Sequence, residues 1–165
     1  MRPPKPEPPA GLDTIASPDE VAQILARAAQ RAAELGLHYA GAVTPPEAWQ
    51  LMRAQRARLV DVRTNIECHF VGRVPDTPNI EWHGADARAR ELFLHQLREV
   101  AREDEALLLL CRSGVRSHRA AEAAAAAGFR QAYNVLEGFE GRLDGARQRG
   151  HVDGWRFHAL PWIQD

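Results

Sequence analysis

Apolar residues follow two patterns along the chain. They recur every three or four positions in some segments and form short unbroken runs in others. Helical spacing or helix-forming composition predicts four main helices, over residues 17–36, 45–55, 86–102 and 117–127. Apolar runs predict short strands within 37–43, 57–62, 106–110 and 131–135. Because the strands alternate with helices, we predict an α/β fold with a central, mostly parallel sheet flanked by helices on both faces.

Two of the helix starts carry a capping signature. Ser17-Pro18-Asp19-Glu20 and Thr44-Pro45-Pro46-Glu47 each combine a hydroxyl cap, a proline and a glutamate in the order typical of a helix N-terminus. Weaker patterns predict a helical turn within 64–70, a short strand at 79–82 and a short helix over 141–148.

The same patterns divide the chain into three parts. Residues 1–16 are rich in proline and are predicted to form a mobile tail. Residues 17–40 are predicted to be an N-terminal helical extension, whose apolar face needs a partner, either this domain or a second subunit. Residues 41–165 are predicted to form the main domain, with the tryptophan-bearing C-terminal end packed across it.

Length and composition indicate a globular protein with no bulk electrostatic preference. The chain has 165 residues and a formal net charge of −1, which does not favour nucleic acid or a membrane as partner. The N-terminus has no apolar core typical of a secretory signal, and no apolar run approaches the ~18 residues of a membrane span. We therefore expect a cytoplasmic protein with reduced thiols.

One segment concentrates the candidate chemistry. Four leucines at 107–110 lead into Cys111-Arg112-Ser113-Gly114-Val115-Arg116-Ser117 and then into an alanine-rich helix. This order places Cys111 at the carboxyl end of a buried strand, where α/β proteins bind ligands. Loop amides, a helix N-terminus and two arginines favour a thiolate there, and Ser117 is expected to cap the helix. The segment predicts a nucleophilic cysteine that holds an anion.

The spacing of the loop separates two kinds of cysteine chemistry. Cysteine phosphatases place an arginine after five intervening residues, whereas here Arg116 follows Cys111 after four, and Ser117 takes the phosphatase arginine's position. A shorter loop favours a smaller anion, or one that is attacked at sulfur.

The loop from Cys111 to Ser117 resembles the active-site loop of the rhodanese family of sulfurtransferases. Further segments resemble the same family over about residues 41–162: Leu59-Val60-Asp61-Val62-Arg63, Glu67 with Gly72-Arg73-Val74-Pro75, Asn134-Val135-Leu136-Glu137-Gly138-Phe139, Gly154-Trp155 and Leu160-Pro161-Trp162. Two positions depart from the family pattern, since Arg73 replaces a histidine and Asp76 a glycine.

The resemblance implies a rhodanese-like α/β domain, here with an extra N-terminal helix, that carries sulfur as a persulfide on Cys111. It implies a small anionic donor such as thiosulfate or a persulfide, and a thiol or cyanide as acceptor. It also implies that Arg112, Ser113, Gly114, Val115 and Arg116 form the substrate-binding loop, with Arg116 binding the donor. No metal or organic cofactor is implied. The N-terminal helix lies outside the match and is a candidate surface for a homodimer or a protein partner.

Two alternatives to a sulfurtransferase are kept: a non-enzymatic rhodanese-like binding or regulatory module, and a cysteine phosphatase or arsenate reductase. The retained Cys111 disfavours the first and the short loop disfavours the second. Asp61, Arg63 and Glu67 are supporting candidates, although their types favour a structural charge pair near the end of the sheet. Cys68 has no cationic surroundings and is expected to be structural, not a resolving thiol.

Overall fold

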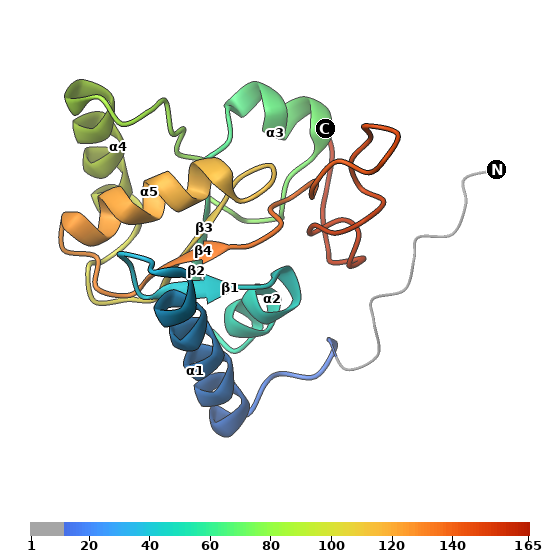
Figure 1. Ribbon diagram of the computed structural model, residues 1–165, viewed down its shortest axis with the longest axis horizontal. Helices are drawn as coiled ribbons and strands as arrows, with labels where there is room; N and C mark the ends of the chain where they lie inside the picture. The colour runs from blue at the N-terminus through green and yellow to red at the C-terminus, as the bar shows by residue number, and fades with distance from the viewer. Residues whose placement is uncertain (1–11) are drawn as a thin grey trace.

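The computed structural model describes residues 12–165, and in this range four strands alternate with five helices (Figure 1). In chain order the elements are α1 (Pro18–Leu35), β1 (Gly41–Val43), α2 (Pro45–Arg53), β2 (Arg58–Asp61), α3 (Asn65–Val71), α4 (Ala87–Val100), β3 (Leu107–Leu110), α5 (Val115–Ala126) and β4 (Ala132–Val135). None of the described helices is long and apolar enough to cross a membrane.

The strands form one parallel sheet in the order β1-β4-β3-β2. Strand β3 lies inside the sheet, where Leu110 pairs with Asp61 on β2 and Leu109 pairs with Asn134 on β4. Because all strands run the same way, their carboxyl ends share one edge, which is where such sheets carry their sites. The predicted parallel sheet is confirmed.

The four leucines of β3 show how helices come to cover both faces. Side chains of a strand alternate between faces. Leu108 and Leu110 pack in a cluster with residues of α1 and α2, and Leu107 and Leu109 pack in a second cluster with residues of α4 and α5. All four side chains are buried, which explains why the run is unbroken and apolar.

Helix α1 packs on its own domain. Its start at Ser17 has the predicted capping box, and its buried side chains include Ile24 and Ala28. A Cβ added at Gly41 would lie 2.4 Å from the carbonyl oxygen of Ala28, so the missing side chain lets helix and strand meet closely. The structure thus decides where the apolar face goes, while a partner on the outer face of α1 remains a prediction.

The predicted N-terminal tail is only partly within the described residues. Residues 1–11 lie outside them. From residue 12 on the chain is described, and Leu12 is buried in the same cluster as α1.

One predicted strand is shorter than expected, and two other minor predictions are wrong. The first strand spans only Gly41–Val43, because Gly36 ends α1 in a left-handed conformation and bends follow it. Residues 79–82 form a single bridge, between Asn79 and Asp61, instead of a strand. Residues 141–148 form turns instead of a helix, because the Asp144 carboxylate accepts the amides of Ala146 and Gln148 and so competes with helical bonding.

Candidate active site

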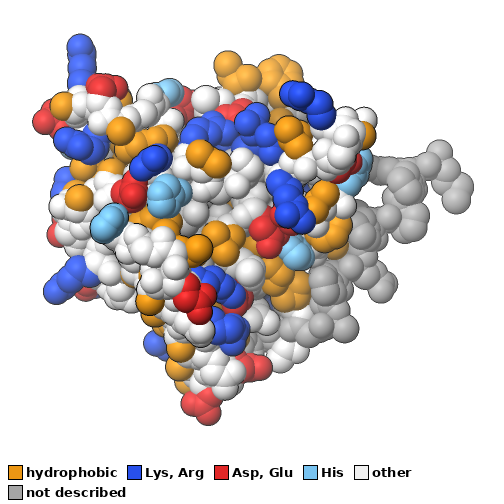
Figure 2. All heavy atoms as spheres, in the orientation of Figure 1, with side chains coloured by type: hydrophobic (Ala, Val, Ile, Leu, Met, Phe, Trp, Pro, Cys, Tyr) orange, Lys and Arg blue, Asp and Glu red, His pale blue; other side chains and the backbone are white. Residues whose placement is uncertain are grey.

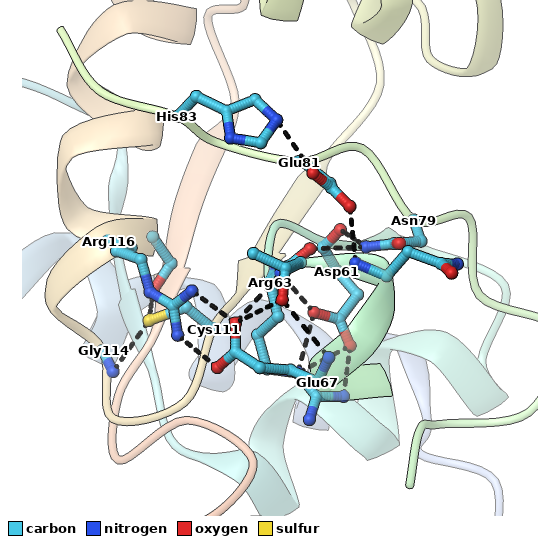
Figure 3. Close-up of polar contacts among 12 residues, drawn as sticks. Asp61, Arg63, Glu67, Asn79, Glu81, His83, Cys111, Gly114 and Arg116 are labelled. Carbon is cyan, nitrogen blue, oxygen red and sulfur yellow. Dashed lines mark hydrogen bonds and ion pairs between the residues drawn. The ribbon is translucent and has the colours of Figure 1, made fainter. Parts of the chain in front are cut away.

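Cys111 lies directly after β3, at the carboxyl edge of the sheet, and its side chain is buried. Two groups donate to its sulfur: the backbone N–H of Gly114 at 3.1 Å and the hydroxyl of Ser117 at 3.2 Å (Figure 3 shows the Gly114 contact). Both donors stabilise negative charge on sulfur, because hydrogen bonds to a charged form favour that form. Two hydrogen-bond donors therefore hold the sulfur of the predicted nucleophile.

The expectation that Ser117 caps the following helix is wrong. Helix α5 begins at Val115, its N-cap is Gly114 with φ of 92°, and no side chain caps it. Since a glycine adopts positive φ freely, the helix starts two residues earlier than predicted. Ser117 is therefore inside the first turn, fully buried, with its hydroxyl turned to the cysteine.

Asn134 is a site residue that sequence reasoning did not single out. It lies on β4, is almost completely buried, and touches the loop with both ends of its amide. Its Oδ1 accepts from the Ser117 hydroxyl at 2.6 Å, and its Nδ2 donates to the carbonyl oxygen of Gly114 at 3.1 Å. The available signal in the sequence was a polar residue inside a mostly apolar predicted strand.

Arg116 is turned toward Glu67 of α3 (Figure 3). Its two terminal nitrogens each donate to one carboxylate oxygen at 2.7 Å. Thr64, the N-cap of α3, also donates to Glu67 through its N–H and its hydroxyl, each at 3.0 Å. Mainly through the Arg116 hydrogen bonds, the pKa of Glu67 falls to about 2, from an ordinary 4.5.

Backbone hydrogen bonds from the segment after β4 hold the rest of the loop in place. Phe139 donates its N–H to the carbonyl oxygen of Cys111 at 2.8 Å, and Glu140 donates to that of Arg112 at 2.9 Å. A Cβ on Gly138 would lie 2.5 Å from the backbone of Arg112 and Ser113, so this contact requires glycine. The loop backbone is held while the Arg112 side chain stays exposed.

Asp61 and Arg63 form a buried ion pair beside the loop. Arg63 Nη2 lies 2.6 Å from Asp61 Oδ2 and also donates to the carbonyl oxygen of Gly72 at 2.9 Å. The Arg63 guanidinium stacks over the Phe139 ring at 4.2 Å, which accounts for its Nη1, a buried atom with no hydrogen-bond partner. Within residues 12–165 no hydrogen bond links this pair to Cys111. Glu67, a third supporting candidate from the sequence, pairs with Arg116 and not with Asp61 or Arg63.

Cys68 is a buried free thiol on α3, and Cys111 is free as well. Burial, reinforced by the nearby charge of Asp61, raises the pKa of the Cys68 thiol to about 12. Such a thiol is a poor nucleophile. In the described part of the chain, no group of three His, Cys, Asp or Glu side chains could hold a metal ion.

The surface around the loop mixes positive charge with exposed apolar side chains. In Figure 2, arginine side chains gather where α3 approaches the start of α5, with hydrophobic side chains beside them. Ile66 and Phe70 of α3 and Val115 of the loop are all about 70% exposed.

Comparisons with known proteins agree with this architecture. A family model described as "Rhodanese-like domain" matches residues 44–143. The crystal structure of Rv0390 from M. tuberculosis is 46% identical, with a TM-score of 0.66, over 77% of this chain and 99% of that one. The uncharacterized protein RP600 of Rickettsia prowazekii is 34% identical, over 68% of this chain and 87% of its own. The thiosulfate sulfurtransferase GlpE of Haemophilus influenzae is 31% identical, over 60% and 84%.

Proposed function

The chain belongs to the rhodanese-like domain family, and from that premise we propose that it is a sulfurtransferase carrying sulfur as a persulfide on Cys111. One observation carries the proposal: a buried cysteine sulfur at the carboxyl edge of the sheet, with an amide and a hydroxyl donating to it. The similarity to a thiosulfate sulfurtransferase supports thiosulfate as a donor.

The first half of the proposed reaction loads the cysteine. The Cys111 thiolate attacks the outer sulfur of thiosulfate and forms a new S–S bond. The bond between the two sulfurs of thiosulfate breaks, and its electron pair leaves with sulfite. The outer sulfur of the resulting persulfide then carries one negative charge.

The second half unloads it. Cyanide or a thiolate attacks the outer sulfur of the persulfide, and the S–S bond breaks. The electron pair returns to Cys111, which becomes a thiolate again, and the product is thiocyanate or a new persulfide. No proton, oxidant or reductant is needed for either half to balance.

The other residues of the loop have distinct roles in this scheme. The Gly114 N–H and the Ser117 hydroxyl stabilise the Cys111 thiolate, both as attacking group and as leaving group. Arg116 supplies positive charge to the anionic donor, but Glu67 already holds its terminal nitrogens, so the donor binds a partly neutralised cation. Arg112 is exposed and free to reach an anion at the rim.

Mass spectrometry after incubation with thiosulfate tests the proposal. We expect the protein to gain the mass of one sulfur atom, to lose it on adding cyanide, and to gain nothing as Cys111→Ala. Cys68→Ala is the matched control and should load normally, because that thiol is buried and protonated. Failure to load from either thiosulfate or a small-thiol persulfide would refute the proposal. Hydrolysis of an aryl phosphate without sulfur loading would favour the phosphatase alternative.

A further inference from the structure

The Ser117 hydroxyl has one proton and two acceptors within reach. Its oxygen lies 2.6 Å from Asn134 Oδ1 and 3.2 Å from the Cys111 sulfur. A hydroxyl can donate to only one of them at a time. The three side chains are almost completely buried, so no large body of solvent replaces the bond that is lost.

The orientation of the Asn134 amide makes this competition permanent. Its Nδ2 donates to the carbonyl oxygen of Gly114, and this bond turns Oδ1, the acceptor end, toward Ser117. If the amide were reversed, Oδ1 would face the carbonyl oxygen of Gly114, and two acceptors would meet there without a proton between them. The carbonyl of the same glycine whose N–H binds the sulfur therefore sets the acceptor that competes for the hydroxyl.

We propose that Asn134 is a positioning residue that makes the Ser117 hydroxyl respond to the charge on Cys111. When the sulfur is a thiolate, the hydroxyl donates to it. When the sulfur is uncharged, as a thiol or as the inner sulfur of a persulfide, the hydroxyl donates to Asn134. The net stabilisation of the thiolate is therefore the free-energy difference between the hydrogen bond to Cys111 and the hydrogen bond to Asn134. It is smaller than the full free energy of the bond to sulfur.

This inference deepens the proposed function and rests on it in one respect, that Cys111 alternates between nucleophile and leaving group. A more stabilised thiolate leaves more readily but attacks less strongly. Because the hydroxyl donates to Asn134 whenever the sulfur is uncharged, the Cys111 thiolate is stabilised to an intermediate degree. This degree suits both its attack on the donor and its departure from the persulfide.

The test is the pH dependence of alkylation of Cys111 by iodoacetamide, followed by mass spectrometry on the full chain. We expect Ser117→Ala to raise the midpoint by about one pH unit, because a donor to the charged sulfur is lost. We expect Asn134→Ala to lower it, because the hydroxyl is released to the sulfur. The double variant should match Ser117→Ala, because in this proposal Asn134 affects the charge on the sulfur through the Ser117 hydroxyl.

Several outcomes would overturn the inference. An unchanged alkylation midpoint in Ser117→Ala would show that the hydroxyl does not stabilise the thiolate. This variant loses only the hydroxyl group, so we expect it to fold. A raised midpoint in Asn134→Ala, or an added effect in the double variant, shows that Asn134 merely supports the loop. Asn134→Leu, which fills the same space without polar atoms, carries the same expectation if the alanine variant unfolds. Alkylation needs no sulfur donor, so these results stand apart from any failure of sulfur loading.

Discussion

Glu67 binds both terminal nitrogens of Arg116, each at 2.7 Å, across 49 positions of the sequence. The arginine expected to bind the donor anion is thus already paired with a carboxylate. We therefore expect anion affinity at this site to depend on how strongly Glu67 competes for Arg116, although Glu67 does not touch the cysteine sulfur.

Replacing this carboxylate should strengthen donor binding. Glu67→Gln removes a negative charge but keeps an oxygen for Arg116 and Thr64, so we expect the KM for thiosulfate to fall about fivefold, equivalent to ~1 kcal/mol. Arg116→Ala should raise the KM by a similar factor, and we expect it to affect donor use more than folding. Steady-state kinetics with cyanide as acceptor measures both KM values. A higher KM in Glu67→Gln would contradict the competition between Glu67 and the donor for Arg116.

The same pair predicts an acid-dependent loss of stability. The pKa of Glu67 is lowered to about 2 in the folded protein from an ordinary 4.5, so its contribution is fully present above pH 4.5 and disappears as pH falls toward 2. Urea unfolding of the wild type and Glu67→Gln should show a stability difference that is constant near neutrality and shrinks over this window. A difference independent of pH would show that the charge is not responsible.

The buried pair of Asp61 and Arg63 should support the fold. Removing one partner leaves an uncompensated buried charge, so we expect Arg63→Met to lower the free energy of unfolding by ~3–5 kcal/mol. The matched control is Arg102→Met, which breaks the exposed pair with Asp104 and should cost less than ~1 kcal/mol. Denaturant unfolding measures both losses. Equally small losses would show that burial of the ion pair does not determine its contribution to stability.

Gly138 should be required for the shape of the loop that follows Cys111. Its φ of 68° disfavours other residues, and a Cβ would collide with the backbone of Arg112 and Ser113 at 2.5 Å. We expect Gly138→Ala to lose ~1–3 kcal/mol of stability and most sulfur loading. Gly145→Ala, with open space around it, is the control and should behave as wild type. Normal loading in Gly138→Ala would mean that the loop tolerates displacement.

Helix α1 should contribute to the stability of the whole domain. Ile24 is 1% exposed in the core, so Ile24→Ala should cost ~2–5 kcal/mol in a single unfolding transition. Leu35→Ala, at an exposed position of the same helix, should cost much less. Two separate unfolding transitions would instead indicate that the helix is an independent extension.

Sequence patterns predicted most of the fold because their signals are local. The capping boxes at Ser17 and Thr44, the leucine run of β3 and the glycine after α1 each act within a few residues. A third capping box, Thr64 with Glu67, went unnoticed although its spacing is the same. The helix expected at 141–148 failed because Asp144 satisfies nearby amides in a turn, a choice that helical propensity does not reveal.

By itself, the sequence determined that Cys111 follows a buried strand in a short, arginine-bearing loop, because strand, loop and helix are adjacent in the chain. Only the tertiary structure decided what surrounds the sulfur. Ser117 faces it because α5 begins at Gly114, and Asn134 joins it because β4 pairs with β3. Arg116 meets Glu67 because α3 and the loop lie at the same edge of the sheet. Such contacts depend on strand order and on where a helix begins, and neither is written in the spacing of residues along the chain.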